Sequence, residues 1–400
     1  MNQSKPFPSR RAASIQLSVI GEMSRLADET QAVNLSSGMP DFDPPAEILA
    51  AAMAALQSGD NQYAFTFGTP AFGAAIAEKM RQYNRVPTDY ETEVTVTCGV
   101  SEALSVTMLA LTDPGDEVII LEPWYENYLP SCQMAGVRPH FVTLHEPHYA
   151  FDPDELRRAF NARTRLIIVN TPHNPTGKVF SRDELNVIAT LCQEYDVIAV
   201  ADEIYEQFVY DGCQHISLAS LDGMQGRTVT VGGLGKTYAV TGWRLGWAVA
   251  APPLTAAIRK LHEYLTICAP TPLQAGGLAA LNLPQSYYTT MRQEYAARRA
   301  ILLKALDEVE FGYQQPQGAY YVMADFSSLG WEKGRFGRPG WSDDRAFAEY
   351  LARQVGVVGV PGSSFYAQGK HGTTRLRFTF AKKEATLKQA AERLACLKND

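Results

Sequence analysis

A lysine placed directly after a glycine-rich loop is the first feature of this 400-residue chain that could carry out chemistry. Lys236 follows the segment Val231–Gly235, which contains three glycines. A phosphate-cradling P-loop would also require glycine where the chain has Thr230, and a dinucleotide-binding loop would require glycine in place of Tyr238. Two interpretations remain: a tight loop that carries a solvated lysine, and a lysine held rigidly so that it can form a Schiff base.

Polar residues at the ends of two strand-like segments form a second group of candidates. The segment Asn170–Gly177 (NTPHNPTG) follows one apolar run, and Asp202 follows the apolar run Ala199–Ala201. Open α/β sheets bind ligands at the carboxyl ends of their strands, so these residues could share a site. The plain structural alternatives are a turn for the first segment and a helix N-cap for Asp202.

Seven strand-like segments, most of them short and rich in Val and Ile, are available to position these residues. They are Glu93–Thr97, Glu117–Leu121, Arg138–Leu144, Arg165–Asn170, Val197–Ala201, Thr228–Val231 and Arg244–Ala250. Helix-like segments lie between several of them. This alternation predicts an α/β fold in which a largely parallel sheet is covered by helices on both faces.

The helix-like segments also have recognisable ends. Ser101–Leu111 is apolar and stops before an Asp-Pro-Gly sequence, and Ser181–Tyr195 opens with a capping box. The spans 260–310 and 383–397 are typical of amphipathic helices. The chain is irregular around 326–344 and then resumes with a helix and two strands, which predicts a smaller α+β layer near the C-terminus.

Composition excludes several functional classes. Lys and Arg number 36 against 43 Asp and Glu, giving a net charge of −7, so a nucleic-acid-binding surface is not expected. No apolar run is long enough to cross a bilayer, and no signal-peptide core is expected. The six cysteines are scattered without a CxxC pair, which indicates a cytoplasmic protein without a disulfide framework or cysteine-type zinc site. His140, His145 and His148 lack metal-ligand spacing, so no metal is predicted.

Taken together, the motifs resemble those of the class I aminotransferases, the fold-type-I enzymes that use pyridoxal phosphate. The resemblance covers residues 30–390 and is closest to the kynurenine, glutamine and methionine aminotransferase branch. The motifs that carry it are NQY at 61–63, TCGVSEAL at 97–104, PGDEV at 114–118, HNPTG at 173–177, DEIY at 202–205, GKTYAVTGWRLGW at 235–247 and RFTFAKKE at 377–384. It implies a seven-stranded, mostly parallel sheet sandwiched by helices in a large cofactor domain (49–288). It also implies a smaller α+β domain whose C-terminal part is 289–400, with 1–48 as an arm and part of that domain.

The resemblance implies a role for each polar residue around the cofactor ring. Lys236 would form the internal aldimine and move the proton. Asp202 would keep the pyridine nitrogen protonated. Tyr205 and Asn174 would hydrogen-bond the phenolic oxygen of the ring, and Asn170 would be a further polar neighbour.

Other residues match the family's phosphate site. Gly99, Val100 and Ser101 open a helix whose N–H groups and dipole suit a dianion, and Arg244 matches the phosphate arginine. Tyr63 matches a tyrosine that reaches the phosphate from the other subunit, which implies a homodimer. Tyr125 matches the residue that stacks on the ring. A hydroxyl-bearing residue usually stands where this chain has Gly233, which predicts weaker cofactor retention than Gly233→Ser would give.

The substrate's α-carboxylate needs a fixed cation, and the FAKKE alignment assigns this role to Arg377 rather than Arg375. Gly38 would let the backbone approach the same carboxylate, and Asn174 and Tyr125 would also contact the substrate. The expected reaction is amino transfer from an L-amino acid to a 2-oxo acid, with neutral, sulfur-containing or aromatic side chains favoured. Two alternatives remain open: a β- or γ-eliminating lyase or specialised biosynthetic enzyme on the same fold, and a binding module without catalysis.

Overall fold

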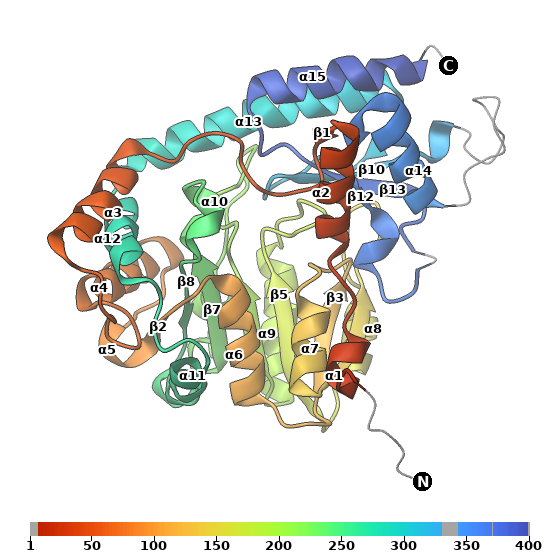
Figure 1. Ribbon diagram of the computed structural model, residues 1–400. Helices are drawn as coiled ribbons and strands as arrows, with labels where there is room; N and C mark the ends of the chain where they lie inside the picture. Colours follow the sequence, from red (N-terminus) through yellow and green to blue (C-terminus); the bar gives the residue numbers. More distant parts are fainter. Residues whose placement is uncertain (1–6, 330–342, 370, 399–400) are drawn as a thin grey trace, which may run out of the picture.

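The computed structural model describes residues 7–329, 343–369 and 371–398, and its centre is the predicted seven-stranded sheet (Figure 1). The strand order is β2-β8-β7-β6-β5-β3-β4, and only β8 runs antiparallel to its neighbours in this sheet. The strands are β2 (Val94–Thr97), β3 (Glu117–Glu122), β4 (Arg138–Thr143), β5 (Thr164–Asn170), β6 (Ile198–Asp202), β7 (Thr228–Gly233) and β8 (Gly246–Val249). The α/β fold class is therefore confirmed.

Both faces of the sheet are buried, which explains why its central strands are continuous apolar runs. In β5, Leu166 and Ile168 pack into one core cluster and Ile167 and Val169 into another. The first cluster includes residues of α6 (Val100–Leu111), α7 (Tyr128–Ala135) and α11 (Pro252–Leu265), and the second those of α8 (Pro153–Ala159) and α9 (Arg182–Glu194). The predicted capping box is present, since Ser181 and Glu184 exchange hydrogen bonds at the start of α9.

The helical span predicted over 260–310 is divided into three helices. These are α11, α12 (Thr271–Leu281) and α13 (Gln285–Glu308). Pro270 and Pro284 stand at the N-caps of the second and third. Proline lacks an N–H group and ends the preceding helix while fitting the start of the next one, so the periodicity alone overstated the continuity.

A second layer combines both ends of the chain. An antiparallel sheet has the order β12-β13-β10-β9, and β1 pairs with β11 in parallel. The helices α13 and α15 lie side by side over this layer (Figure 1). Its elements are β1 (Val33–Asn34), β9 (Gly312–Tyr313), β10 (Tyr321–Asp325), α14 (Asp344–Tyr350), η7 (Leu351–Val355), β11 (Val357–Val358), β12 (Val360–Pro361), β13 (Arg375–Thr379) and α15 (Glu384–Leu394). The irregular segment predicted at 326–344 falls mostly on 330–342, outside the described residues, and the domain boundaries stay a prediction.

The remaining described helical segments flank these layers. They are α1 (Arg10–Ser14), α2 (Val19–Thr30), α3 (Ala46–Ser58), α4 (Pro70–Lys79), the π-helical turn η1 (Met80–Asn84), α5 (Tyr90–Glu93), η2 (Leu218–Ser220), η3 (Gln225–Arg227), α10 (Leu234–Thr237), η4 (Thr241–Trp243), η5 (Ser327–Leu329), η8 (Gly362–Phe365) and η9 (Ala395–Lys398). Among the helices of the described ranges, none combines the length and apolarity that a membrane span requires.

Candidate active site

A cavity lies where the polar ends of the central strands meet. Strand β5 ends at Asn170, β6 at Asp202 and β7 at Gly233, and neighbouring parallel strands bring these ends to one edge of the sheet. About 610 Å³ there is free of protein atoms, part of it open to solvent. The lining residues are Gly99, Val100, Ser101, Tyr125, Asn170, Asn174, Asp202, Ile204, Tyr205, Gly235, Lys236, Thr241, Arg244 and Leu245. Every predicted cofactor residue except Tyr63 is among them.

Lys236 enters this cavity from α10, the short helix that follows β7. Its Nζ lies 3.4 Å from the carbonyl oxygen of Gly38, a long contact for a charged donor. No ion pair of this lysine is found among the described residues. The amine is therefore held near the cavity without being consumed by a strong partner, as a nucleophile requires.

Asp202 is the buried acid of the cavity, with 2% of its surface exposed. Burial raises the pKa of its carboxyl to about 6, and the hydrogen bond from Tyr128 opposes that rise. The Tyr128 hydroxyl donates to Oδ2 at 2.8 Å, and the Ile204 N–H donates to Oδ1 at 3.3 Å. Asp202 is therefore mostly ionised at neutral pH and is hydrogen-bonded by neutral groups.

Asn170 links the strand ends to the Asn174 turn. Its Nδ2 donates to the backbone oxygen of Asp202 at 2.8 Å, and its Oδ1 accepts from the Asn174 N–H at 2.7 Å. Tyr205 completes this wall, and its hydroxyl lies 3.1 Å from that of Tyr321. Burial raises the pKa of Tyr205, so its hydroxyl stays protonated and can donate.

One corner of the cavity is built for an anion. Gly99 precedes α6 with φ of 80°, a conformation that suits glycine, and leaves the first N–H groups of the helix pointing outward. A Cβ at Gly99 would fall 2.4 Å from Nη2 of Arg244, so the guanidinium lies against the start of the helix. Two positive features in contact are stabilised when an anion binds between them.

Arg377 is a fully buried cation beside this cavity, with 0% of its surface exposed. Nη1 donates to Oδ1 of Asn174 at 2.9 Å and Nη2 to the oxygen of Ser36 at 2.6 Å, while Nε has no partner. Its described partners are thus neutral. Arg375, by contrast, pairs with both Glu146 and Asp325. Since a buried charge without a counter-ion is costly, Arg377 is the one poised to bind a carboxylate.

Tyr321 packs so closely on Gly38 that a side chain at position 38 has no room. A Cβ at Gly38 would lie 2.0 Å from the Tyr321 hydroxyl, so only glycine fits there. The Gly38 oxygen also accepts from Tyr320 at 3.0 Å. The Tyr321 ring in turn stacks against the guanidinium of Arg377 at 4.3 Å. The predicted carboxylate-binding residues, Arg377 and Gly38, are therefore in one packed group.

Tyr63 is the predicted cofactor residue that the structure leaves away from the cavity. Its side chain is 77% exposed, and Phe65 nearby is 72% exposed. Other large apolar residues are exposed on α3 and at the end of α11. These are Leu49, Met53, Leu56, Tyr264, Leu265 and Ile267.

Gly233 changes one expectation. A Cβ at this position would lie 2.8 Å from the Leu245 oxygen and 3.1 Å from the Gly246 Cα. Any side chain would therefore push β7 from β8, and Gly233→Ser cannot simply restore a hydroxyl. That the missing hydroxyl weakens cofactor retention remains a prediction. Gly233→Ser should be compared with Gly233→Ala, because both variants add a Cβ but only serine adds the hydroxyl.

Two residues near the cavity, Tyr128 and Tyr321, were not singled out from the sequence, although they contact its polar groups. Ile204 and Thr241 also line the cavity; they stand inside quoted motifs but were given no role. A tyrosine three residues after Tyr125, at the start of a helix, was the available hint of Tyr128. Nothing in the sequence distinguished Tyr321 from its neighbour.

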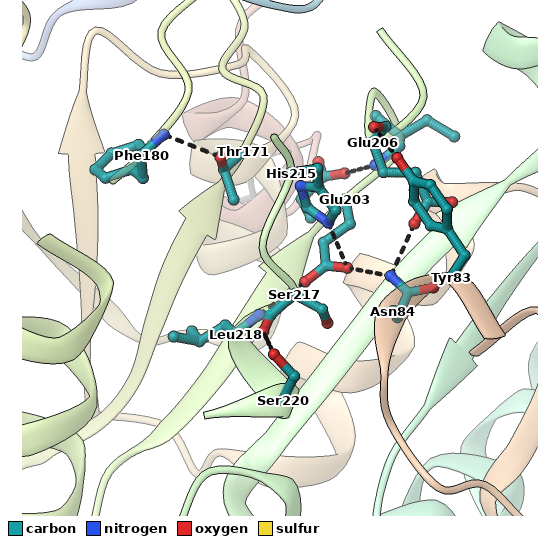
Figure 2. Close-up of polar contacts among 12 residues, drawn as sticks. Tyr83, Asn84, Thr171, Phe180, Glu203, Glu206, His215, Ser217, Leu218 and Ser220 are labelled. Atoms are coloured by element: carbon teal, nitrogen blue, oxygen red, sulfur yellow. Dashed lines mark hydrogen bonds and ion pairs between the residues drawn. The ribbon is translucent and has the colours of Figure 1, made fainter. Parts of the chain in front are cut away.

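A buried polar network braces the turn that follows Asp202, as Figure 2 shows. Asn84 Nδ2 donates to both Glu203 and Glu206 at 2.9 Å. Glu203 also accepts from His215 Nε2 at 3.1 Å and from the Leu218 N–H at 3.1 Å. These links tie residues 203–206 to Asn84 on one side and to the segment 215–218 on the other.

The same network contains a possible metal-ligand group. Ligand atoms of Glu203, Glu206 and His215 lie within 4.8 Å of one another. However, Lys79 forms an ion pair with Glu206, and Asn84 already bridges the two carboxylates. Both carboxylates are therefore already engaged by protein groups.

The fold and the cavity define a family, and comparison with known proteins agrees. The family model for aminotransferase class I and II matches residues 30–394, so the chain belongs to this family and is an aminotransferase. It is 37% identical to human kynurenine–oxoglutarate transaminase 1 over 98% of both chains. It is 34% identical to the methionine aminotransferase of Escherichia coli, covering 98% of this chain and 99% of that protein. The predicted resemblance to this branch is confirmed.

A solved structure is equally similar. The N-succinyldiaminopimelate aminotransferase of Mycobacterium tuberculosis superimposes with a TM-score of 0.92 at 37% identity, over 98% of this chain and 100% of that one.

The donor set of the cavity fits the cofactor that the family implies. Pyridoxal phosphate carries an aldehyde, a basic ring nitrogen and a phosphate. The cavity offers Lys236 as the amine, Asp202 as a buried acid and Arg244 beside a helix N-terminus.

Proposed function

We propose that this protein is a pyridoxal-phosphate-dependent aminotransferase that moves the α-amino group of an L-amino acid to a 2-oxo acid. The observation that carries the proposal is the pairing of two adjoining sites, a cavity and a buried cation. One combines Lys236, Asp202 and Arg244 around a single cavity. The other is Arg377, a buried cation whose described hydrogen bonds go to neutral oxygens. A cofactor site adjoining a carboxylate site is the arrangement that amino-acid chemistry requires.

Each side chain would then have a defined task. When bound, the cofactor supplies the electron sink for the bond that breaks at the substrate's α carbon. Lys236 holds the cofactor, and its Nζ moves the proton off that carbon. Asp202 keeps the ring nitrogen protonated. Tyr205 and Asn174 donate hydrogen bonds to the ring oxygen, with Asn170 orienting the latter.

The remaining residues would bind and orient. The N–H groups of Val100 and Ser101 and the Arg244 guanidinium hold the phosphate, while Gly99, whose own N–H donates to the Thr97 oxygen at 2.8 Å, lets the chain turn beside it. Tyr125 stacks on the ring. Arg377 and Gly38 bind the substrate's α-carboxylate, alongside Asn174. Burial of Arg377 strengthens this contact because water does not screen it.

The substrate side chain is proposed to be neutral, sulfur-containing or aromatic. Among the described lining residues, Arg244 and Lys236 are the cations, and both are assigned to the cofactor. No cation of that lining is then left for a second carboxylate. Two relatives are named for kynurenine and methionine, which agrees with this choice, whereas the N-succinyldiaminopimelate aminotransferase, at the same level of identity, is named for a substrate with further carboxylates.

We also propose a cytoplasmic homodimer in which Tyr63 of one subunit reaches the phosphate in the other. The exposed tyrosine and the apolar residues of α3 and α11 support this. All six cysteines are free thiols, as in proteins of a reducing compartment.

The test follows the nitrogen atom. A ¹⁵N-labelled amino acid and an unlabelled 2-oxo acid are incubated with the cofactor-loaded enzyme, and the products are identified by mass spectrometry. We expect labelled nitrogen in the new amino acid, and a 2-oxo acid that keeps the donor's side chain. Release of ammonia with a shortened or unsaturated acid would instead indicate an eliminating lyase. Lys236→Ala should abolish transfer, whereas Lys260→Ala, at an exposed position, should not.

A further inference from the structure

His262 occupies a buried position that the reaction does not use. It lies on α11, its side chain is 0% exposed, and it has hydrogen-bond partners on both ring nitrogens. Nδ1 lies 2.6 Å from Oε1 of Glu102, and Nε2 lies 2.7 Å from the oxygen of Thr66. A backbone oxygen is only an acceptor, so Nε2 must carry a proton.

The proton between Nδ1 of His262 and Oε1 of Glu102 also belongs to the histidine. The Glu102 carboxylate accepts from the Thr266 hydroxyl at 2.6 Å and from the Cys98 N–H. A carboxylate that accepts several hydrogen bonds is stabilised in its ionised form. Burial acts to raise the pKa of Glu102, but these bonds and the one from His262 lower it overall. The ring is therefore an imidazolium that donates from both nitrogens.

The two acceptors of this imidazolium belong to the two segments assigned to phosphate binding. Glu102 is in the first turn of α6, and its other oxygen holds the Cys98 N–H at the start of the Cys98–Ser101 loop. Thr66 is inside the aromatic segment Tyr63–Phe67, whose Tyr63 is proposed to serve the partner's site. Arg259, one turn before His262, stacks on Phe67 of the same segment at 4.1 Å.

We propose that His262 is a positioning residue that, as an imidazolium, ties the Cys98–Ser101 loop to the aromatic segment Tyr63–Phe67. The tie fixes the place of Tyr63 relative to the loop, so each subunit's contribution to its partner depends on the geometry of its own phosphate loop. A neutral histidine has one N–H, and one of the two links would then lose its hydrogen.

The charged surroundings define the pH range of this tie. Glu102 on α6 and Glu263 on α11 act on the ring. Glu102 also faces the thiol of Cys98, near which Cys268 and Arg244 lie, and Arg259 of α11 stacks on Phe67. In the aromatic segment itself, Tyr63 is the ionisable residue. Burial lowers the pKa of His262, but the bond to Glu102 raises it overall above 6.5. A raised folded-state pKa means that the tie is complete below pH 6.5 and is lost as the pH rises through the raised value. Burial raises the pKa of Cys98 to about 11, so its thiol stays neutral over that range.

Amide hydrogen exchange of residues 63–68 tests this inference, measured from about pH 6 to pH 9 and corrected for the intrinsic rate. In the natural protein, protection should fall with an inflection above pH 6.5. In His262→Gln, exchange at neutral pH should be about tenfold faster, the factor for losing one hydrogen bond to a charged group, and the inflection should vanish. In Glu102→Gln the inflection should move to lower pH. The matched control is His140→Gln on the exposed edge of β4.

A purely structural role would change the stability of these variants without moving the inflection. Unchanged exchange of residues 63–68 in His262→Gln, or the same inflection in that variant, would overturn the inference. A second readout, the rate at which pyridoxal phosphate leaves the holoenzyme, should follow the same pH profile; that readout rests on the proposed function. If the protein retained no pyridoxal phosphate at any pH, the proposed function would fail, while the exchange measurement would still decide the role of His262.

Discussion

Arg377 and Asp202 are buried charges of opposite sign whose hydrogen-bond partners in the described chain are neutral. A protein that only needed stability would pair such charges or replace them with apolar residues. Neither forms an ion pair among the described residues, although Lys236 in the same cavity favours the charged form of Asp202. A ligand could supply the paired charge: a carboxylate for Arg377 and a protonated ring nitrogen for Asp202. The cost of burying them unpaired is best explained by binding.

Tyr128→Phe should shift the acid limb of cofactor binding to higher pH. Asp202 loses its charge as the pH falls through about 6, and cofactor affinity should fall with it. Removing the Tyr128 hydroxyl removes a bond that favours the ionised form, so the carboxyl should be protonated about one to two pH units higher. The measurement is the affinity of the cofactor-free enzyme for pyridoxal phosphate across pH.

The control for that series is Tyr149→Phe, because Tyr149 is also buried but belongs to the core cluster around α8 and α9. An acid limb that stays in place in Tyr128→Phe would contradict the assigned role of Tyr128.

Arg377 and Arg375 form a matched pair two positions apart. Arg377→Met should raise the KM for the amino acid at least about a hundredfold, because a buried charged hydrogen-bond partner is lost. Arg375→Met should leave that KM nearly unchanged, since Arg375 is engaged by Glu146 and Asp325. Steady-state kinetics with one amino acid compares them. The account would be wrong at this point if the two variants behaved alike or in the opposite order.

At the scale of elements, the site exists because strand ends, a helix start and a turn meet. Asn170 and Asp202 are the last residues of β5 and β6, and the register pairs them directly. Helix α6 presents its N-terminus at the same edge. The turn after β6 carries Tyr205 and is held from behind by Asn84, which ends the π-helical turn η1.

Asn84→Ala should loosen that turn. Two buried carboxylates would lose a shared donor, which costs about 1–3 kcal/mol in the free energy of unfolding. Cofactor affinity should fall as well, because Asp202 and Tyr205 flank the freed turn. Thermal unfolding and cofactor titration measure the two effects, with Asn186→Ala on the exposed face of α9 as the control. A stable variant with normal cofactor affinity would show that the brace does not position the turn.

The elements themselves were largely predictable, for a physical reason. The central strands of a sheet that is buried on both faces must be continuous apolar runs, and β3, β5 and β6 were found from that pattern. The edge strand β4 is a mixed, partly exposed segment, which was found from its short length and its boundaries. The breaks between helices α11, α12 and α13 were not predicted, because the amphipathic periodicity continues across Pro270 and Pro284. Arg244 was placed in a strand, but it lies just before β8 in a left-handed conformation with φ of 52°.

At the scale of the whole molecule, the contacts that matter join residues far apart in the sequence. Tyr128 lies 74 positions from Asp202, and Glu102 lies 160 from His262. Sequence motifs identified the lining of the cavity because those residues form recognisable local patterns. Long-range partners leave no local pattern, so Tyr128, Tyr321 and the Glu203 network became visible only in three dimensions.

The exposed apolar residues of α3, of the aromatic segment and of the end of α11 predict a dimer. Met53→Glu and Leu265→Glu should each weaken it by about 2 kcal/mol, or about thirtyfold in Kd. Sedimentation velocity measures the shift toward monomer, and cofactor loss should accelerate in parallel because Tyr63 leaves the partner's site. Gln389→Glu, an exposed position on α15, should have no effect. A natural protein that sediments as a monomer at all concentrations would refute the proposed assembly.

The central claim is that Lys236 is the amine that holds the cofactor. Borohydride treatment of the loaded enzyme, followed by peptide mass spectrometry, fixes the cofactor on whichever amine holds it. The account predicts label on the peptide containing Lys236, and loss of that label when an amino acid is added before the reductant. Label on another lysine, or none on Lys236 in a protein that still transfers amino groups, would contradict it.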